Sequence, residues 1–229
     1  MVSRPFWPLQ ATTLVRARWL ILAPHPDDET IGVGALIAEL ADLKTLVGVI
    51  HLTDGGGSRP VRDSADRQRL VHQRRYEASQ ALWRLTGSRR YLLPSLGWTD
   101  GRPAAAGSVR YRESNRRLRA ICLRHRVDVI VAPMADDAHC DHRAAYQLAT
   151  HCVQSVPRAV RVAEYCVWGT APSSRTHRSI RSACMPRGRR RSALRAHQSQ
   201  LYPSNAQAFS LPMAMRNPKT FDFVYLRRS

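Results

Sequence analysis

Residues 18–29 read Arg-Trp-Leu-Ile-Leu-Ala-Pro-His-Pro-Asp-Asp-Glu, an apolar run followed directly by a histidine and three acids. Residues 18–23 have the length and composition of a buried parallel strand, which Pro24 ends. In open α/β sheets, ligands bind just beyond the carboxyl ends of the strands. We therefore expect residues 24–29 to form a functional loop at one edge of a parallel sheet.

The rest of the chain alternates between helix-like and strand-like segments. Helices are predicted over 30–43, 63–85, 109–126 and 141–156, and strands over 45–52, 91–93, 127–132 and 159–168. This alternation predicts an α/β fold in which a mainly parallel sheet carries helices on both faces. We expect a single domain over 1–229, with its core at about 18–200 and a basic C-terminal segment over 169–229.

Composition excludes several classes of protein. The chain has 36 Lys and Arg against 17 Asp and Glu, a net charge of +19. This excess suits an anionic partner, although a bias toward arginine can also follow from genome composition. The sequence shows no membrane-spanning segment and no secretory signal. The 5 cysteines form no Cys-x-x-Cys pair, which favours reduced thiols and a cytoplasmic protein.

The acids of the first loop are more than helix caps. A cap by Asp27 or Asp28 would explain one acid of the three. His25 and Asp28 lie three positions apart on a compact turn, so both can point at one metal ion. We interpret the loop as half of a metal site.

A second loop, residues 133–142, follows the strand predicted at 127–132 and reads Pro-Met-Ala-Asp-Asp-Ala-His-Cys-Asp-His. His139 and His142 lie on neighbouring faces of one helical turn. Asp141 can orient an imidazole by accepting its other ring proton. Cys140 is a candidate soft ligand, but we expect it to be a buried free thiol.

Together the two loops supply His25, Asp28 and His142 as three metal ligands. A mixed nitrogen and oxygen set with an open fourth position is typical of a catalytic zinc, here one per chain. Asp27 and His139 remain beside the metal. One of them can serve as general base and the other as electrostatic partner or general acid.

In this combination the sequence resembles the PIG-L-type (LmbE-like) N-acetylglucosaminyl deacetylase family over roughly residues 19–200. Weaker matches occur in the family's order: the Gly-rich loop at 54–57, Arg-Arg-Tyr-Glu at 74–77 and Ala-His-Gln-Ser-Gln at 196–200. The resemblance implies a Rossmann-like fold, a single zinc ion and hydrolysis of an N-acetyl group on an amino sugar.

The resemblance also implies residue roles. The metal would be held by His25, Asp28 and His142, with Asp27 as the general base. His139 would stabilise the oxyanion or protonate the departing amine, and Asp141 would hold a histidine in its working tautomer. Arg74 matches a position near the sugar, although an ion pair with Glu77 on a solvated helix face is the alternative.

Two features outside these motifs leave alternatives open. Trp98, in the loop 94–108, either stacks on a sugar as a substrate-binding residue or packs in the core. Residues 165–221 contain nine arginines, one lysine and no acid. This stretch is either a solvated helix start after a turn at 186–188 or a contact surface for an anionic substrate or membrane.

The leading hypothesis is a zinc-dependent N-deacetylase that releases acetate from an N-acetylglucosaminyl-type amino sugar, free or in a glycoconjugate. The alternatives are an amidase acting on a larger amide of a sugar conjugate and a catalytically silent basic binding protein. A nucleic-acid partner is not expected, because arginines and aromatic residues do not interleave as in a stacking platform. The sequence identifies neither the acceptor nor the oligomeric state.

Overall fold

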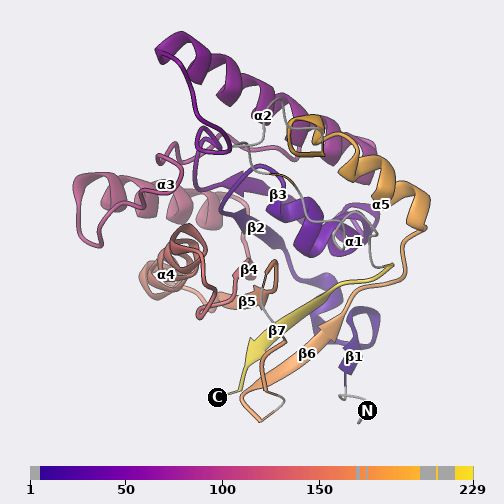
Figure 1. Cartoon of the computed structure of the whole chain (residues 1–229). Coiled ribbons are helices and arrows are strands. Elements are labelled where there is room, and N and C mark those ends of the chain that lie inside the picture. The colour runs from indigo at the N-terminus through magenta and orange to yellow at the C-terminus, as the bar shows by residue number, and fades with distance from the viewer. Residues whose placement is uncertain (1–5, 169–170, 174, 202–209, 211–219, 229) are drawn as a thin grey trace.

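A computed structural model describes residues 6–168, 171–173, 175–201, 210 and 220–228. Its centre is a seven-stranded sheet in the order β1-β6-β7-β5-β4-β2-β3 (Figure 1). The strands are β1 (Phe6–Pro8), β2 (Trp19–Ala23), β3 (Leu46–His51), β4 (Val129–Pro133), β5 (Arg161–Tyr165), β6 (His177–Arg181) and β7 (Phe223–Arg227). In the sheet described, the pairings are parallel except the two made by β7. The mainly parallel sheet is confirmed.

Helices cover both faces of the sheet, as predicted. They are α1 (Asp28–Asp42), α2 (Ser64–Thr86), α3 (Val109–Arg124), α4 (Cys140–Ser155), α5 (Arg187–Leu194) and α6 (Gln198–Leu201), with 3₁₀ turns at Leu9–Ala11 and Thr13–Arg16. One core lies under α1, α2 and α5, and the other lies under α3 and α4. Strand β2 contributes to both cores, because its side chains alternate between the two faces of the sheet. Trp19 and Ile21 belong to the first core, and Leu20 and Leu22 belong to the second. Among the described residues, no helix is both long enough and apolar enough to cross a membrane.

The strand predicted at 91–93 is wrong as a strand of its own. Leu92 makes a single parallel bridge to Val49, and the segment forms two backbone hydrogen bonds to that residue. Pro94 follows at once and has no N–H to donate, so the ladder is interrupted there. It resumes only as isolated contacts, from Leu96 N to the carbonyl oxygen of His51 (2.9 Å) and from Trp98 N to that of Leu52 (3.0 Å). Strands β1, β6 and β7 were not predicted, because the polar pattern His-Arg-Ser-Ile-Arg of β6 resembles a solvated segment.

The described parts of the C-terminal segment belong to the sheet and the core, and residues 202–209 and 211–219 of its basic stretch lie outside the described residues. The helix expected after residues 186–188 is α5, with Arg187 and Arg191 exposed. The solvated interpretation is wrong for Arg190, which is 2% exposed and pairs with Asp222 at 2.5 Å. Arg190 also donates to the carbonyl oxygens of Thr30 and Ile31 in α1. The segment therefore braces the helix that begins in the first loop.

That brace sits at an irregularity in α1. Val33 has non-helical angles (φ −138°, ψ 25°), which interrupt the backbone ladder of the helix. Asp222 Oδ2 accepts hydrogen bonds from the backbone N–H groups of Ala35 (2.6 Å) and Leu36 (3.1 Å). Arg190 and Asp222 thus satisfy carbonyls and N–H groups that the interrupted helix leaves without internal partners.

Candidate active site

The first loop places three acids where β2 passes into α1. Asp27 occupies the N-cap position of α1, but its side chain makes no capping hydrogen bond. Asp28 Oδ2 accepts from the backbone N of His25 at 3.0 Å and lies 3.0 Å from His25 Nδ1. The same oxygen lies 3.3 Å from His142 Nε2 at the start of α4. The carboxylate of Asp28 therefore joins the two loops.

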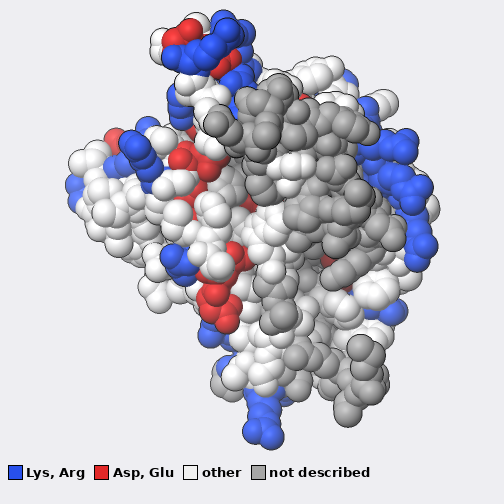
Figure 2. Space-filling model, viewed as in Figure 1, with Lys and Arg blue, Asp and Glu red and all other residues white. Residues whose placement is uncertain are grey.

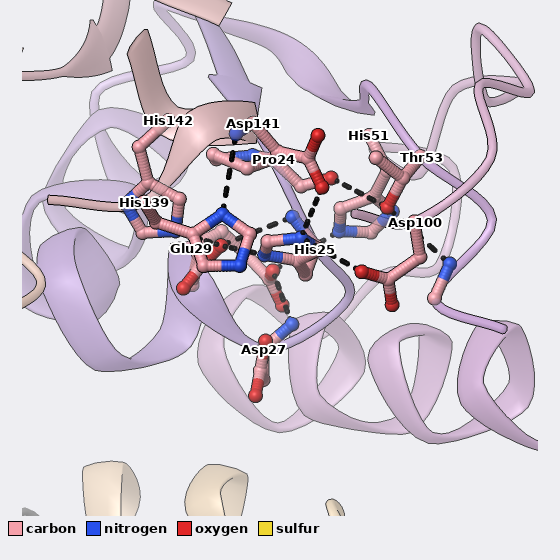
Figure 3. A network of polar contacts seen from close by, with 12 residues as sticks. Pro24, His25, Asp27, Glu29, His51, Thr53, Asp100, His139, Asp141 and His142 are labelled. Atoms are coloured by element: carbon pink, nitrogen blue, oxygen red, sulfur yellow. Dashed lines mark hydrogen bonds and ion pairs between the residues drawn. The ribbon is translucent and has the colours of Figure 1, made fainter. Parts of the chain in front are cut away.

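The second loop brings two imidazoles to the same place. His139 caps α4, since its Nδ1 accepts a hydrogen bond from the backbone N of Asp141 at 3.2 Å. Its ring centre lies 4.8 Å from that of His25 and 5.1 Å from that of His142. Figure 3 shows the three rings gathered between the β2–α1 loop and the start of α4. A structural cap and a catalytic role are therefore compatible for His139, because the cap uses Nδ1 and leaves Nε2 for other partners.

Further carboxylates face the ring nitrogens that point away from Asp28. His25 Nε2 lies 2.9 Å from Asp141 Oδ2 and 3.3 Å from Asp100 Oδ1. His142 Nδ1 lies 3.1 Å from Asp137 Oδ2. A carboxylate behind an imidazole is the usual arrangement around a metal-binding histidine, because it fixes the tautomer and the ring orientation. The sequence motifs did not single out Asp100 or Asp137. Asp137 lies within the second motif loop, whereas Asp100 lies in the loop 94–108, which no motif marked.

The donor set fits a divalent metal. Two ligands about 2.1 Å from a tetrahedral ion stand about 3.4 Å apart, and His25 Nδ1 and His142 Nε2 lie 3.0 and 3.3 Å from the shared Asp28 oxygen. Within the described part of the chain, neither ring nitrogen of buried His142 has a hydrogen bond of good geometry. Three imidazoles, His25, His139 and His142, also have ligand atoms within 4.8 Å of one another.

Cys140 departs from the expectation of a buried thiol. It is partly exposed, and its Sγ lies 3.9 Å from both the carbonyl oxygen of Gly101 and Asp141 Oδ1. With His139 and Asp141 it forms a further group whose ligand atoms lie within 4.8 Å of one another. The thiol thus stands at the rim of the site.

The site stabilises positive charge. Burial lowers the pKa of His25, but Asp100, Asp141 and Asp28 together raise it well above its usual value. Burial likewise opposes protonation of His142, yet Asp28 and Asp137 raise its pKa to about 9. Burial raises the pKa of Asp28, and the charges of His142 and His25 together with the hydrogen bond from His25 more than reverse this, leaving that pKa far below normal. The same field favours a divalent cation.

Asp27 differs from Asp28 although it is its neighbour. Burial raises the pKa of Asp27 to about 6, opposed by the charge of Arg74, whose Nη2 lies 3.5 Å from Asp27 Oδ1. A carboxyl with a pKa close to neutrality suits a general base better than a permanent anion does.

Arg74 is fully buried rather than solvated. Its Nε and Nη1 atoms lack a hydrogen-bond partner among the residues the structure describes. Glu77, the partner proposed for a surface ion pair, instead accepts hydrogen bonds from the backbone N (2.9 Å) and Oγ (2.6 Å) of Ser199. Arg74 therefore points toward the site, and Glu77 holds the C-terminal Ala-His-Gln-Ser-Gln motif against α2.

A cavity of ≈ 190 Å³ opens onto these groups. It is lined by His25, Asp27, Asp28, Gly57, Ser58, Arg74, Asp100, His139 and Trp168. The expectation that Trp98 stacks on a sugar is wrong, because its side chain is fully buried and its Nε1 donates to Ser114 Oγ at 2.8 Å. The aromatic residue at the cavity is Trp168, just after β5, which no sequence motif marked.

A second polar layer lies behind the loop. Glu29 accepts from the backbone N of Asp27 and pairs with His51 Nε2, both at 3.0 Å. His197, from the C-terminal motif, lies 3.2 Å from Thr30 Oγ1. Burial lowers the pKa of His197 to about 4, so the ring is held neutral. Glu29, the third acid of the loop, thus holds the backbone of Asp27 in place.

A comparison with protein-family models identifies a family for this chain. The family model PIG-L, described as GlcNAc-PI de-N-acetylase, matches residues 20–153, more than half of the chain. A comparison with curated proteins gives no match.

Solved structures share the fold. The conserved protein TT1542 from Thermus thermophilus is 25% identical with a TM-score of 0.59, covering 81% of this chain and 80% of its own. The N,N'-diacetylchitobiose deacetylase from Pyrococcus horikoshii is 22% identical with a TM-score of 0.61, covering 82% and 72%. The zinc-inhibited form of the teicoplanin deacetylase Orf2 is 16% identical with a TM-score of 0.62, covering 93% and 99%. With the family match over residues 20–153, which contains both loops of the site, the chain belongs to the PIG-L family.

Proposed function

We propose that this protein is a zinc-dependent N-deacetylase that removes the acetyl group from an N-acetylglucosaminyl-type amino sugar, free or in a conjugate, and releases acetate. One observation carries the proposal: the buried carboxyl of Asp27 stands beside converging histidine and aspartate donors at a small cavity. Membership of the PIG-L family supports it. So do the printed activities of two neighbours, deacetylases of N,N'-diacetylchitobiose and teicoplanin.

In this proposal His25, Asp28 and His142 hold the zinc. When bound, zinc supplies Lewis acidity to the acetamide carbonyl and to the attacking water. Asp141, Asp100 and Asp137 keep the two imidazoles oriented through their distal nitrogens. A rigid donor set of this kind costs little reorganisation when the reaction builds up charge.

Asp27 takes the proton of the attacking water. Its pKa of about 6 leaves it mostly ionised at neutral pH, yet basic enough to accept a proton. Arg74 keeps this carboxyl from becoming fully neutral through its positive charge. Glu29 fixes the backbone of Asp27 from below, through the hydrogen bond from the Asp27 N–H.

His139 supplies a hydrogen-bond donor for the oxyanion. Burial and the charges of His25 and His142 lower the pKa of His139, which favours the neutral ring. Because Nδ1 accepts the N–H of Asp141, the hydrogen of the neutral ring is assigned to Nε2. That N–H can donate a hydrogen bond to the developing oxyanion, and the proton that the departing amine takes is the one that Asp27 accepted from the water.

The cavity suits an acetamido group with one sugar ring. Arg74 offers N–H groups that no described residue accepts, and Asp100 offers a carboxylate, a pairing able to bind vicinal hydroxyls. Trp168 provides an apolar face at the same cavity, against which the C–H face of a sugar can pack. We assign to Trp168 the stacking role that the sequence suggested for Trp98.

The test is acetate release from N-acetylglucosaminyl compounds by purified protein supplied with zinc. Asp27→Asn should retain zinc and lose about 10²- to 10⁴-fold in turnover, the usual contribution of a positioned base. Asp42→Asn, an exposed acid at the far end of the same helix, is the matched control and should be fully active.

Two results would contradict the proposal. Unchanged turnover in Asp27→Asn at saturating zinc would move the base elsewhere, with Glu29 the first candidate. Release of a larger acid from sugar amides, without acetate from any acetylated sugar, would make the protein an amidase.

A further inference from the structure

An aromatic ridge runs along the outer side of α2. Tyr76 and Trp83 are 64% and 47% exposed, although both are large and partly apolar. They stand seven residues apart, two turns of the helix, on the side opposite buried Leu70, Ala78 and Leu85. We call Tyr76, Trp83 and the exposed His72 in line with them the α2 ridge. It contributes nothing to the core or to the candidate active site.

The surroundings of the α2 ridge are mainly basic, although Arg69 Nη2 lies 3.7 Å from Asp66 Oδ1 in the first turn of the helix. Arg69, Arg75, Arg89 and Arg90 are exposed on α2 and on the turn that follows it. Between residues 67 and 97 the single acid is Glu77, which is buried and bound to Ser199. The surface of this stretch therefore carries positive charge without any exposed carboxylate to offset it.

Arginine side chains lie next to the aromatic rings of the α2 ridge. The guanidinium of Arg89 lies 5.5 Å from the centre of the Trp83 ring. A hollow of ≈ 360 Å³ lies beside the ridge, lined by His72, Arg75, Tyr76, Ser79, Arg89 and Leu92. Two guanidinium groups at one hollow can hold a phosphate, while the neighbouring rings offer apolar surface.

We propose that the α2 ridge docks this protein on an anionic lipid surface. Tryptophan and tyrosine favour the boundary between water and the acyl region, because the ring is apolar and its N–H or O–H is polar. Arginines near such a surface are attracted by the anionic headgroups. The ridge combines both on the outer face of a single helix, the arrangement of a peripheral contact.

The shape and charge of the ridge argue against other occupants. Its rings project from a convex helix, whereas single-stranded nucleic acid is held in a groove with stacking platforms along it. A second copy of this chain would bring like charge against like charge across the contact. A lipid surface is planar and negative, so it complements a convex basic ridge.

The contact expected through the basic C-terminal segment stays a prediction, and within the described residues only part of that segment is available for it. Arg190 of that segment is committed to Asp222 in the core. The exposed arginines of α5 lie beside α2, with which α5 packs through the hydrogen bond from Arg84 Nη1 to the carbonyl of Ser192. Figure 2 shows Lys and Arg side chains gathered over α5, and Lys and Arg mixed with Asp and Glu at the N-terminal end of α2. The arginines of α5 thus add positive charge on one side of the α2 ridge.

The experiment measures binding of the full chain to vesicles. Wild-type protein is sedimented with vesicles of phosphatidylcholine alone and with vesicles that also contain phosphatidylglycerol, at low and at physiological salt. Two variants test the ridge: Tyr76→Ser with Trp83→Ser, and Arg75→Gln with Arg89→Gln. The control is Arg110→Gln with Arg124→Gln on α3, which removes the same charge from exposed positions elsewhere.

We expect partition to anionic vesicles that each ridge variant weakens by about 10-fold or more, with the control nearly unchanged. Tryptophan emission should shift to the blue on binding, and Trp83→Phe should remove that shift. Circular dichroism and thermal melting confirm that every variant is folded.

Several outcomes would overturn the proposal. Absence of binding to anionic vesicles at low salt would do so. Equal weakening of vesicle binding in the control variant would show that net charge alone, and not the α2 ridge, causes binding. Full binding by the Tyr76→Ser, Trp83→Ser variant would place the contact elsewhere. Tighter binding to an RNA oligonucleotide or to an acidic protein, lost in the same ridge variants, would assign the surface to that partner.

Discussion

Removal of the Asp222 carboxylate should destabilise the protein strongly, although it lies outside the candidate active site. Asp222→Ala leaves the guanidinium of Arg190 buried without its ion pair, which spans 2.5 Å with both side chains 3% exposed or less. It also deprives the backbone N–H groups of Ala35 and Leu36 of their acceptor. Breaking a buried ion pair from one side costs about 3–5 kcal/mol. That is a large fraction of a typical free energy of unfolding of about 5–15 kcal/mol.

The assay is urea unfolding of metal-free protein, followed by circular dichroism. The matched control is Asp42→Ala, which removes the partner of Arg189 on the same helix α5. That ion pair spans 3.5 Å and Asp42 is 65% exposed, so its loss should cost less than about 1 kcal/mol. Asp222→Asn keeps an oxygen acceptor and should fall between the two.

Equal losses of unfolding free energy in Asp222→Ala and Asp42→Ala would refute the reasoning. They would mean that the C-terminal segment does not brace α1. If Asp222→Ala fails to fold, the comparison of Asp222→Asn with Asp42→Asn carries the same test.

Three further predictions concern the site. His142→Ala should lose most of the bound zinc and His151→Ala, an exposed histidine further along α4, should not; full zinc content of His142→Ala by elemental analysis would defeat the ligand assignment. Burial lowers the pKa of His197 to about 4, below the unfolded value of about 6.5. The unfolded chain therefore binds this proton first, and unfolding free energy should fall by up to about 3 kcal/mol as pH drops from 6.5 to 4. His197→Gln should flatten that dependence in urea melts at pH 7, 5 and 4, and an unchanged slope would contradict it. Trp168→Ala should raise KM for an acetylated sugar with little effect on melting temperature, whereas Trp98→Phe should lower the melting temperature and leave KM unchanged; the reverse pattern would restore Trp98 to the site.

Local sequence patterns were sufficient for much of the fold. The apolar run that becomes β2 ends at Pro24, and its length and flanking residues alone mark it as a buried strand. The long helices α2, α3 and α4 were likewise placed to within about two residues, because amphipathic periodicity and flanking turns act over a few residues. The metal motifs could be found for the same reason, since each lies within one short loop at a strand end.

Contacts between residues far apart in the sequence determined the features that local patterns did not predict. Residue 100 meets His25, and residue 222 meets Arg190 and α1, only because the sheet and its helices bring them together. Insertion of antiparallel β7 between β5 and β6 depends on which edge remains open after the other strands pair. A periodic pattern carries no signal for such contacts.

By itself, then, the sequence determined the strand-and-loop units, the two motifs and the family that they indicate. The tertiary structure decided which carboxylates stand behind each imidazole, that Trp168 rather than Trp98 reaches the cavity, and that Arg190 belongs to the core. The physical reason is that burial and ion pairing are properties of the assembled chain. The same tryptophan or arginine is a surface group or a core group according to what the rest of the fold packs against it.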